Sequence, residues 1–221
     1  MSKSSQMSKY LLPSKAEIKS LYWDILISDP NNIFDLIYSF YTSGNRYYHN
    51  IEHIINCQQQ LDGFIKNNEY LNMTNINELR LALWFHDIIY DARLNNNEEL
   101  SAILAEELLR PIAESYDNVP ELILFTKHNR VANNFNEELI SDIDLSILGS
   151  FHKEYKKYSD GIRLEYGFVP DYQYYQARLK ILQSIYNKDR IYYTRYFKNL
   201  YEVSAKQNVL QEIKFIKEIL K

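Results

Sequence analysis

Helical periodicity, without any alternating pattern typical of strands, is the feature that most constrains the fold of this chain of 221 residues. Apolar residues recur at intervals of three and four along most of the sequence. Glycine and proline number only five each, so few residues interrupt the helices. The sequence therefore predicts an all-α fold, a single helical bundle over residues 13–221 that follows a disordered N-terminal segment over residues 1–12.

Capping signals divide the chain into separate helices. Ser14 with Glu17 forms a capping box for a helix through Ile27, and Asp29-Pro30 predicts the start of a second helix. The further predicted helices span residues 49–66, 77–87, 98–109, 136–148, 151–166, 171–186 and 203–220, with a shorter one after Asp117 that carries His128 near its end. The helix over 77–87 is apolar nearly all round, so we expect it at the centre of the fold.

Cysteine usage and hydropathy bear on where the protein works. The one cysteine, Cys57, excludes an internal disulfide framework and is typical of a reducing compartment. It lies beside apolar residues, which favours a small buried side chain over a reactive thiol. No apolar stretch reaches bilayer length, and no signal peptide opens the chain. We therefore expect a cytoplasmic protein that does not bind a membrane.

The net charge of −4 divides unevenly along the chain. Residues 1–149 carry 11 basic and 21 acidic side chains, and residues 150–221 carry 14 basic and 8 acidic ones. The basic part could supply cations for a phosphate substrate, or the two parts could simply attract each other where they pack. No dense stripe of lysine and arginine indicates a nucleic-acid duplex as partner. The oligomeric state stays open, a homo-oligomer included.

Histidines stand at informative positions in this chain. His49 and His53 are four residues apart, so on a helix they share one face. His86 adjoins Asp87 at the end of the most apolar predicted helix, where a buried imidazole and carboxylate need partners. A metal ion would satisfy both side chains. Taken alone, the dipeptide has a simpler interpretation, in which His86 caps the helix and Asp87 pairs with an arginine.

Several segments, in the expected order, resemble the motifs of the HD superfamily of metal-dependent phosphohydrolases. The resemblance is carried by residues 46–54 (RYYHNIEHI), 84–91 (WFHDIIYD), 96–102 (NNEELSA), 142–149 (DIDLSILG) and 162–166 (IRLEY). It is greatest to a bacterial subgroup known only as predicted metal-dependent phosphohydrolases. The resemblance implies a helical HD-domain bundle and an enzyme that hydrolyses phosphoric esters.

The resemblance also implies a ligand set for one divalent metal ion. These ligands are His53, His86, Asp87 and Asp144. Asp142 is the alternative to Asp144, from which it lies two residues away and so on a different side of a helix. The metal could be Mn, Mg, Co, Ni, Zn or Fe, because mixed imidazole and carboxylate sites accept all of these.

Proton transfer is assigned by a further likeness within the superfamily. The Tyr-His-Asn-x-x-His arrangement is similar to that of cyclic-nucleotide phosphodiesterases, where the first histidine donates a proton, and this implies that role for His49. Hydrolysis of a cyclic nucleotide is not implied. Asp87 is suited to orient the attacking water as well as to bind metal. Asp91 and Glu98 are candidates for orienting water or ligands, or for a general base, or else are plain surface acids.

Phosphate recognition requires cations, and arginine suits it best. Arg46 and Lys127 lie closest in sequence to the predicted catalytic groups. Arg163 belongs to a C-terminal helix that could fold back over the site, or it could pair with Glu165. The predicted substrate is a nucleotide or another small phosphometabolite.

His128 has two interpretations. It could contact the substrate phosphate or a bound water, or it could be a half-buried histidine at the end of a helix. Asn129 beside it cannot replace a second imidazole, which favours a single metal ion over two.

Two other functions use the same residues. One is iron-dependent oxygenase chemistry on the same helical scaffold, which would require more ligands for two irons. The other is a non-catalytic sensor that binds a nucleotide or a metal. The retained proton donor His49 argues against a sensor, because a protein that only binds has no need of it.

Overall fold

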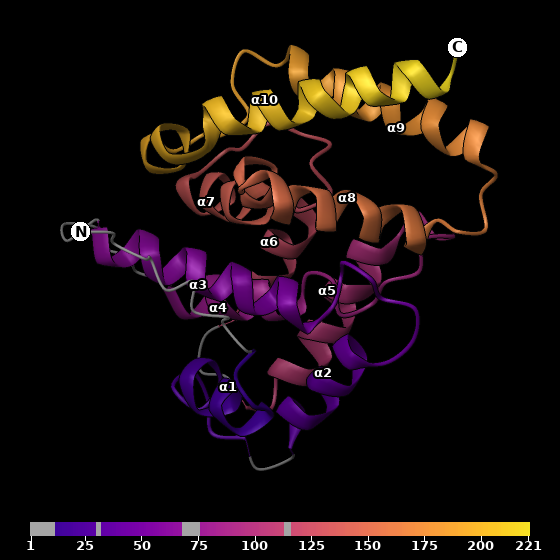
Figure 1. Ribbon diagram of the computed structural model, residues 1–221. Helices are drawn as coiled ribbons and strands as arrows, with labels where there is room; N and C mark the ends of the chain where they lie inside the picture. The colour runs from indigo at the N-terminus through magenta and orange to yellow at the C-terminus, as the bar shows by residue number, and fades with distance from the viewer. Residues whose placement is uncertain (1–11, 30–31, 68–75, 113–115) are drawn as a thin grey trace, which may run out of the picture.

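The computed structural model describes residues 12–29, 32–67, 76–112 and 116–221, and in these ranges all regular structure is helical (Figure 1). This confirms the predicted all-α fold. The helices are α1 Lys15–Tyr22, α2 Ile33–Thr42, α3 Ile51–Asn67, α4 Ile76–Phe85, α5 Asn97–Leu109, α6 Val119–Phe125, α7 Phe135–Asp144, the 3-10 helix η1 Leu145–Gly149, α8 His152–Glu165, α9 Asp171–Asn187 and α10 Arg195–Ile219.

The helices form layers along the long direction of Figure 1. Helices α9 and α10 lie side by side at one end, and α10 also packs on η1. Helices α3, α4, α6 and α7 make up the middle, where α4 contacts α3, α5, α6 and α7. Helices α1 and α2 lie at the other end. As predicted, α4 is therefore central, and every one of its residues from Glu78 to Phe85 is buried.

An aromatic cluster fixes the end of α4 that leads to His86. The indole of Trp84 lies edge-on to that of Trp23, with ring centroids 5.9 Å apart, and to Phe34 at 5.8 Å. All three rings are fully buried. The Trp84 carbonyl accepts a hydrogen bond of 2.8 Å from the Tyr41 hydroxyl. The backbone immediately before His86 is thus held by large rings that pack poorly in any other arrangement.

The two largest differences between the predicted and the observed helix boundaries concern the first and the last helix. The first helix ends at Tyr22 instead of Ile27, because the amides of Trp23 and Asp24 both donate to the Lys19 carbonyl and close the last turn. The last helix begins at Arg195 instead of Val203. There the Thr194 side chain accepts from the Phe197 amide and caps the new start.

Some predictions concern residues that the structure does not describe. Of the N-terminal segment predicted to be disordered, residues 1–12, only Leu12 is among the described residues, and Pro30 of the predicted helix start is not. In the part of the chain that is described, no helix is long and apolar enough to cross a membrane.

Candidate metal centre

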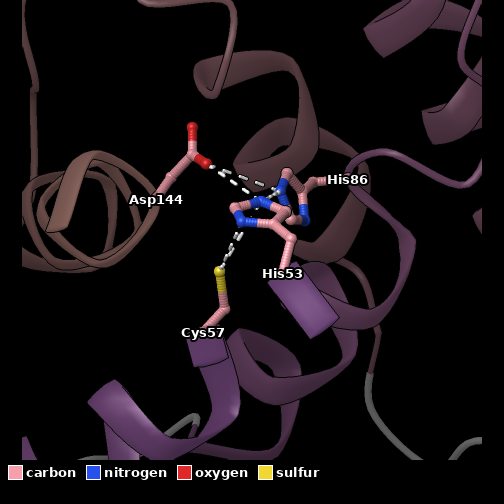
Figure 2. A group of neighbouring side chains, drawn as sticks. All are labelled: His53, Cys57, His86 and Asp144. Carbon is pink, nitrogen blue, oxygen red and sulfur yellow. Dashed lines mark hydrogen bonds and ion pairs between the residues drawn. The ribbon is translucent and has the colours of Figure 1, made fainter. Parts of the chain in front are cut away.

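Four side chains from three separate segments meet in the middle of the bundle. His53 lies in α3, His86 and Asp87 follow the last residue of α4, and Asp144 is the last residue of α7. The His53 Nε2 atom is 3.1 Å from the His86 Nε2 atom, and both nitrogens face the Asp144 carboxylate (Figure 2). The structure therefore brings together all four residues that the resemblance implies as ligands.

The spacing of the four donor atoms is that of ligands around one ion. From His53 Nε2, the distances to Asp87 Oδ2 and Asp144 Oδ1 are both 3.4 Å. From His86 Nε2, the corresponding distances are 3.1 Å and 3.6 Å. Ligand atoms about 2.1 Å from an ion lie about 3.0 Å apart at octahedral angles and about 3.4 Å apart at tetrahedral ones. The distances around the two imidazoles are therefore close to those expected for ligands of one divalent ion.

The tautomer of His86 also suits a metal ligand. Its Nδ1 atom lies 3.0 Å from the carbonyl oxygen of Leu83, three residues earlier in the last turn of α4. A carbonyl only accepts, so Nδ1 carries the proton and donates it. The neutral imidazole then has its lone pair on Nε2, the atom that faces the other ligands.

Electrostatics in the cluster show what a cation would replace. Burial disfavours charge on His86, yet the carboxylates of Asp87 and Asp144 raise its pKa well above the ordinary value. Burial likewise disfavours charge on Asp87, yet the neighbouring histidines, His86 first, lower its pKa well below the ordinary value. Two half-buried carboxylates thus need positive charge between them, and a metal ion supplies it while releasing protons.

Cys57 also lies at this cluster, one turn after His53 in α3. Its Sγ atom is 3.8 Å from Nδ1 and 3.7 Å from Nε2 of His53 (Figure 2). Cys57 can therefore also be grouped with His53, His86 and Asp144 as a possible ligand. Asp87 Oδ2 lies closer to His53 Nε2, at 3.4 Å, and is 3.1 Å from His86 Nε2, so Asp87 is the better fourth ligand. Cys57 is buried, as the sequence predicts.

His128 contacts the other side of Asp144. Its Nε2 atom is 2.8 Å from Asp144 Oδ2, the oxygen that does not face His53 and His86, and its Nδ1 atom is 3.3 Å from the Ser141 hydroxyl. Helix α6 ends at Phe125, so His128 lies in the loop that follows it and not in the helix as predicted. Its φ of 52° is left-handed, a conformation that a residue other than glycine keeps only where its surroundings enforce it. His128 therefore orients a ligand.

Asp142 has a different task from Asp144. Its Oδ1 atom accepts from the Tyr193 amide at 2.7 Å, and its Oδ2 atom accepts from the amide and the hydroxyl of Thr194, both at 2.7 Å. Burial raises the pKa of Asp142 to about 6 despite these bonds. Asp142 thus fastens the loop before α10 to α7, and Asp144 is the aspartate that joins the cluster.

His49 lies beside the donor cluster, and Glu165 and Tyr90 fix the orientation of its ring. Its Nδ1 atom is 2.7 Å from Glu165 Oε2, and its ring stacks on Tyr90 with centroids 4.0 Å apart. Glu165 Oε1 accepts from the backbone amides of Tyr48 at 2.8 Å and His49 at 3.0 Å. Burial acts to raise the pKa of Glu165, but His49 and these amides outweigh it and lower the pKa. The carboxylate therefore fixes both the ring and the backbone of His49.

Glu165 is the functional residue that the sequence reasoning missed. It is the last residue of α8 and lies 116 positions from His49 in the chain. Its side chain is only 1% exposed. The segment 162–166, which resembles a family signature, contains Glu165 and could have indicated it. The prediction from that segment names Arg163 instead.

Gly161 allows α8 to approach this segment closely. A Cβ atom at Gly161 would lie 3.1 Å from the Tyr47 carbonyl oxygen and 3.2 Å from the Tyr48 Cβ atom. Glycine is the residue that leaves this space open in a helix, at some cost in helix stability. The closeness of α8 to residues 47 and 48 is what brings Glu165 within reach of His49.

The predicted phosphate-binding cations are held by other groups. Arg46 donates to the carbonyls of His49, Asp87 and Ile88, at 3.0, 2.6 and 2.7 Å. Arg46 therefore positions the backbone around the site. Contact between Arg46 and a substrate phosphate stays a prediction.

Lys127 and Arg163 lie in ion pairs apart from the donor cluster. Lys127 donates to the Asn95 carbonyl at 2.8 Å and pairs with Glu99 at 2.5 Å. Arg163 donates to the Tyr166 and Val169 carbonyls and pairs with Asp171, which holds the turn between α8 and α9. Neither contacts the metal ligands in the described structure.

The two predicted accessory acids lie in the segment before and at the start of α5. Asp91 accepts from the Arg93 amide at 2.9 Å, and its backbone exchanges hydrogen bonds with the Asn97 side chain. Glu98 lies 3.7 Å from Lys127. These contacts order the loop after the Asp87 segment, and within the described residues neither acid forms a hydrogen bond or ion pair with the donor cluster.

A cleft of about 190 Å³ opens onto the cluster. Its lining includes His53, Asp144 and Tyr48. It is also lined by amides and Glu52 on α3 and by Lys157 on α8, which pairs with Glu52. A small molecule can therefore reach the ligands from this side.

Searches against protein-family models, curated proteins and solved structures match this chain to none of them. The assignment of a function therefore depends on the geometry above and on the motifs within the sequence.

Proposed function

We propose that this protein is a metal-dependent phosphohydrolase that acts on a phosphate ester, a nucleotide or another small phosphometabolite. One observation carries the proposal, namely the convergence of His53, His86, Asp87 and Asp144 at the spacing of ligands around one ion. The resemblance to HD phosphohydrolases supports it, because the same four residues are the ligands that the resemblance implies. The proposal includes a cytoplasmic location.

The chemistry divides between the ion and the chain. When bound, a divalent metal supplies a Lewis acid that polarises a phosphoryl oxygen and makes a water molecule more acidic. His49 then donates a proton to the departing oxygen, with Glu165 stabilising the positive charge that a proton-donating imidazole carries. His128 and Arg46 hold Asp144 and the Asp87 backbone in place while this occurs.

Metal binding is tested first, without reference to activity. Elemental analysis of the purified protein should give one divalent ion per chain. Removal by a chelator should lower the melting temperature, and Mn, Mg, Co, Ni, Zn or Fe should be added back in turn. An ion at 100 times its Kd stabilises the folded state by about 2.7 kcal/mol, which is roughly 5–10 °C for a chain of this size.

Hydrolysis is tested next on the metal-loaded protein. A panel of phosphomonoesters, nucleotides and cyclic nucleotides should yield phosphate release from at least one member. A protein that holds one ion per chain and hydrolyses none of them contradicts the proposal. Two irons per chain with oxygen consumption would favour an oxygenase, and nucleotide binding without turnover would favour a sensor.

A further inference from the structure

The Tyr48 hydroxyl is buried, and it has no hydrogen-bond partner among the described residues. Buried hydroxyl groups in folded proteins are nearly always bonded, so one without a partner requires an explanation. Tyr48 directly precedes His49 and lines the same cleft as His53 and Asp144. The unpaired group is therefore part of the candidate site.

Three rings hold the Tyr48 side chain in place. Its centroid lies 4.9 Å from that of His49, 4.8 Å from that of His53 and 4.7 Å from that of Tyr158. Tyr158 is itself fixed, because both terminal nitrogens of the buried Arg178 donate to its oxygen at 3.2 Å. The hydroxyl cannot turn towards bulk water without breaking this packing.

The hydroxyl is suited to donate. A tyrosine hydroxyl has an ordinary pKa of about 10. The phenol thus keeps its proton at neutral pH. A buried donor without an acceptor is costly, and a negatively charged oxygen is the acceptor that would satisfy it best.

The cations around the cleft indicate which group supplies that oxygen. The cations expected to bind phosphate, Arg46, Lys127 and Arg163, are held by backbone carbonyls and carboxylates, and Lys157 in the cleft pairs with Glu52. Among the described groups around the ligands, the Tyr48 hydroxyl is a donor with no other task. We propose that the Tyr48 hydroxyl donates a hydrogen bond to an oxygen of the phosphoryl group bound at the metal centre, which makes Tyr48 a catalytic residue of the phosphohydrolase proposed above, a role that rests on that function.

Tyr48→Phe tests this, because it removes the hydroxyl and keeps the ring against His49, His53 and Tyr158. The probe is inorganic phosphate, titrated calorimetrically into protein loaded with Mn²⁺. The variant should hold as much metal as the wild type and melt no lower when metal-free, since no internal hydrogen bond is lost. It should bind phosphate roughly 10- to 100-fold more weakly, as expected for a lost bond to a charged acceptor. Tyr172→Phe, at a side chain 61% exposed, is the matched control and should behave as the wild type.

The possible results distinguish a failure of this inference from a failure of the proposed function. If wild type and Tyr48→Phe bind phosphate equally, the inference is wrong and the phosphohydrolase proposal stands. A lower melting temperature of metal-free Tyr48→Phe would show an internal bond and would also overturn the inference. If the metal-loaded wild type neither binds phosphate nor hydrolyses any ester, the proposed function fails, and the role of Tyr48 fails with it.

Discussion

The Glu165 carboxylate offers the sharpest test of how the site is organised. One of its oxygens accepts from the amides of Tyr48 and His49, and the other accepts from His49 Nδ1. Glu165→Gln keeps an oxygen for the two amides but presents an NH₂ group to Nδ1, where a donor then meets a donor. Glu165→Ala leaves all three donors unpaired.

The expected losses follow from these contacts. A hydrogen bond to a charged group is worth about 1.5–3 kcal/mol, so Glu165→Gln should lower the free energy of unfolding by about that amount. It should also lower turnover roughly 10- to 100-fold if the same stabilisation of His49 is lost in the transition state. Glu165→Ala should cost more, about 3–5 kcal/mol, because buried donors are left without partners.

The stability difference should also depend on pH. The folded protein holds the pKa of Glu165 below its ordinary value of 4.5. Its ionised form therefore contributes stability that is fully present above that ordinary value and is lost as the pH falls through the lowered pKa. The difference between wild type and Glu165→Gln should be constant near pH 7 and should shrink as the solution is acidified below about pH 4.5.

Urea unfolding from pH 3 to pH 8 and turnover of a chromogenic phosphomonoester at pH 7 measure these quantities. Metal content serves as the control and should not change, since Glu165 contacts no predicted ligand. Wild-type turnover in Glu165→Gln would refute the idea that this carboxylate supports a proton donor. A stability difference that grows on acidification would refute the assigned direction of its pKa.

Five other substitutions separate ligands from supporting residues. Asp87→Ala should abolish metal binding, whereas His49→Ala should keep the metal and lose turnover; loss of metal in His49→Ala, seen by elemental analysis, would make His49 a ligand. Asp144→Ala should lose the metal, whereas Asp142→Ala should keep it and unfold about 2–4 kcal/mol more easily in urea, because three buried donors lose their acceptor; the reverse pattern would exchange the two aspartates. Arg46→Lys should lower the melting temperature and weaken metal affinity while leaving the KM for the ester unchanged, and a rise in KM alone would instead support the phosphate-binding role expected from the sequence.

The fold and the predicted metal ligands could be inferred from the sequence, for physical reasons. Helical periodicity reports burial directly, so α4 could be placed at the centre from its apolar residues alone. The His86-Asp87 pair at the end of that helix is constrained by the cost of burying it, and the motifs around it supplied His53 and Asp144. The choice between Asp142 and Asp144 depended on which side of α7 faces α3, and periodicity at the end of a helix does not fix that.

The roles of the supporting residues could not be predicted from the sequence, because their partners are far away along the chain. Arg46 looked like a phosphate ligand, but its partners are carbonyls brought near by the packing of α4 against α3. Glu165 reaches His49 only once α8 has folded against residues 47 and 48. The early start of α10 depends on Thr194, whose capping role becomes visible when Asp142 fastens the preceding loop.

The absence of a side chain at Gly161 places thermal stability in conflict with activity. Alanine there would favour the helix by about 0.5–1 kcal/mol in isolation, so selection for thermal tolerance alone could well choose it. The added methyl group would push residues 47 and 48 away by a few tenths of an ångström, just where two amides meet Glu165. A more heat-stable protein with Gly161→Ala would keep its fold and its metal ion, but His49 would lose the orientation in which it donates a proton.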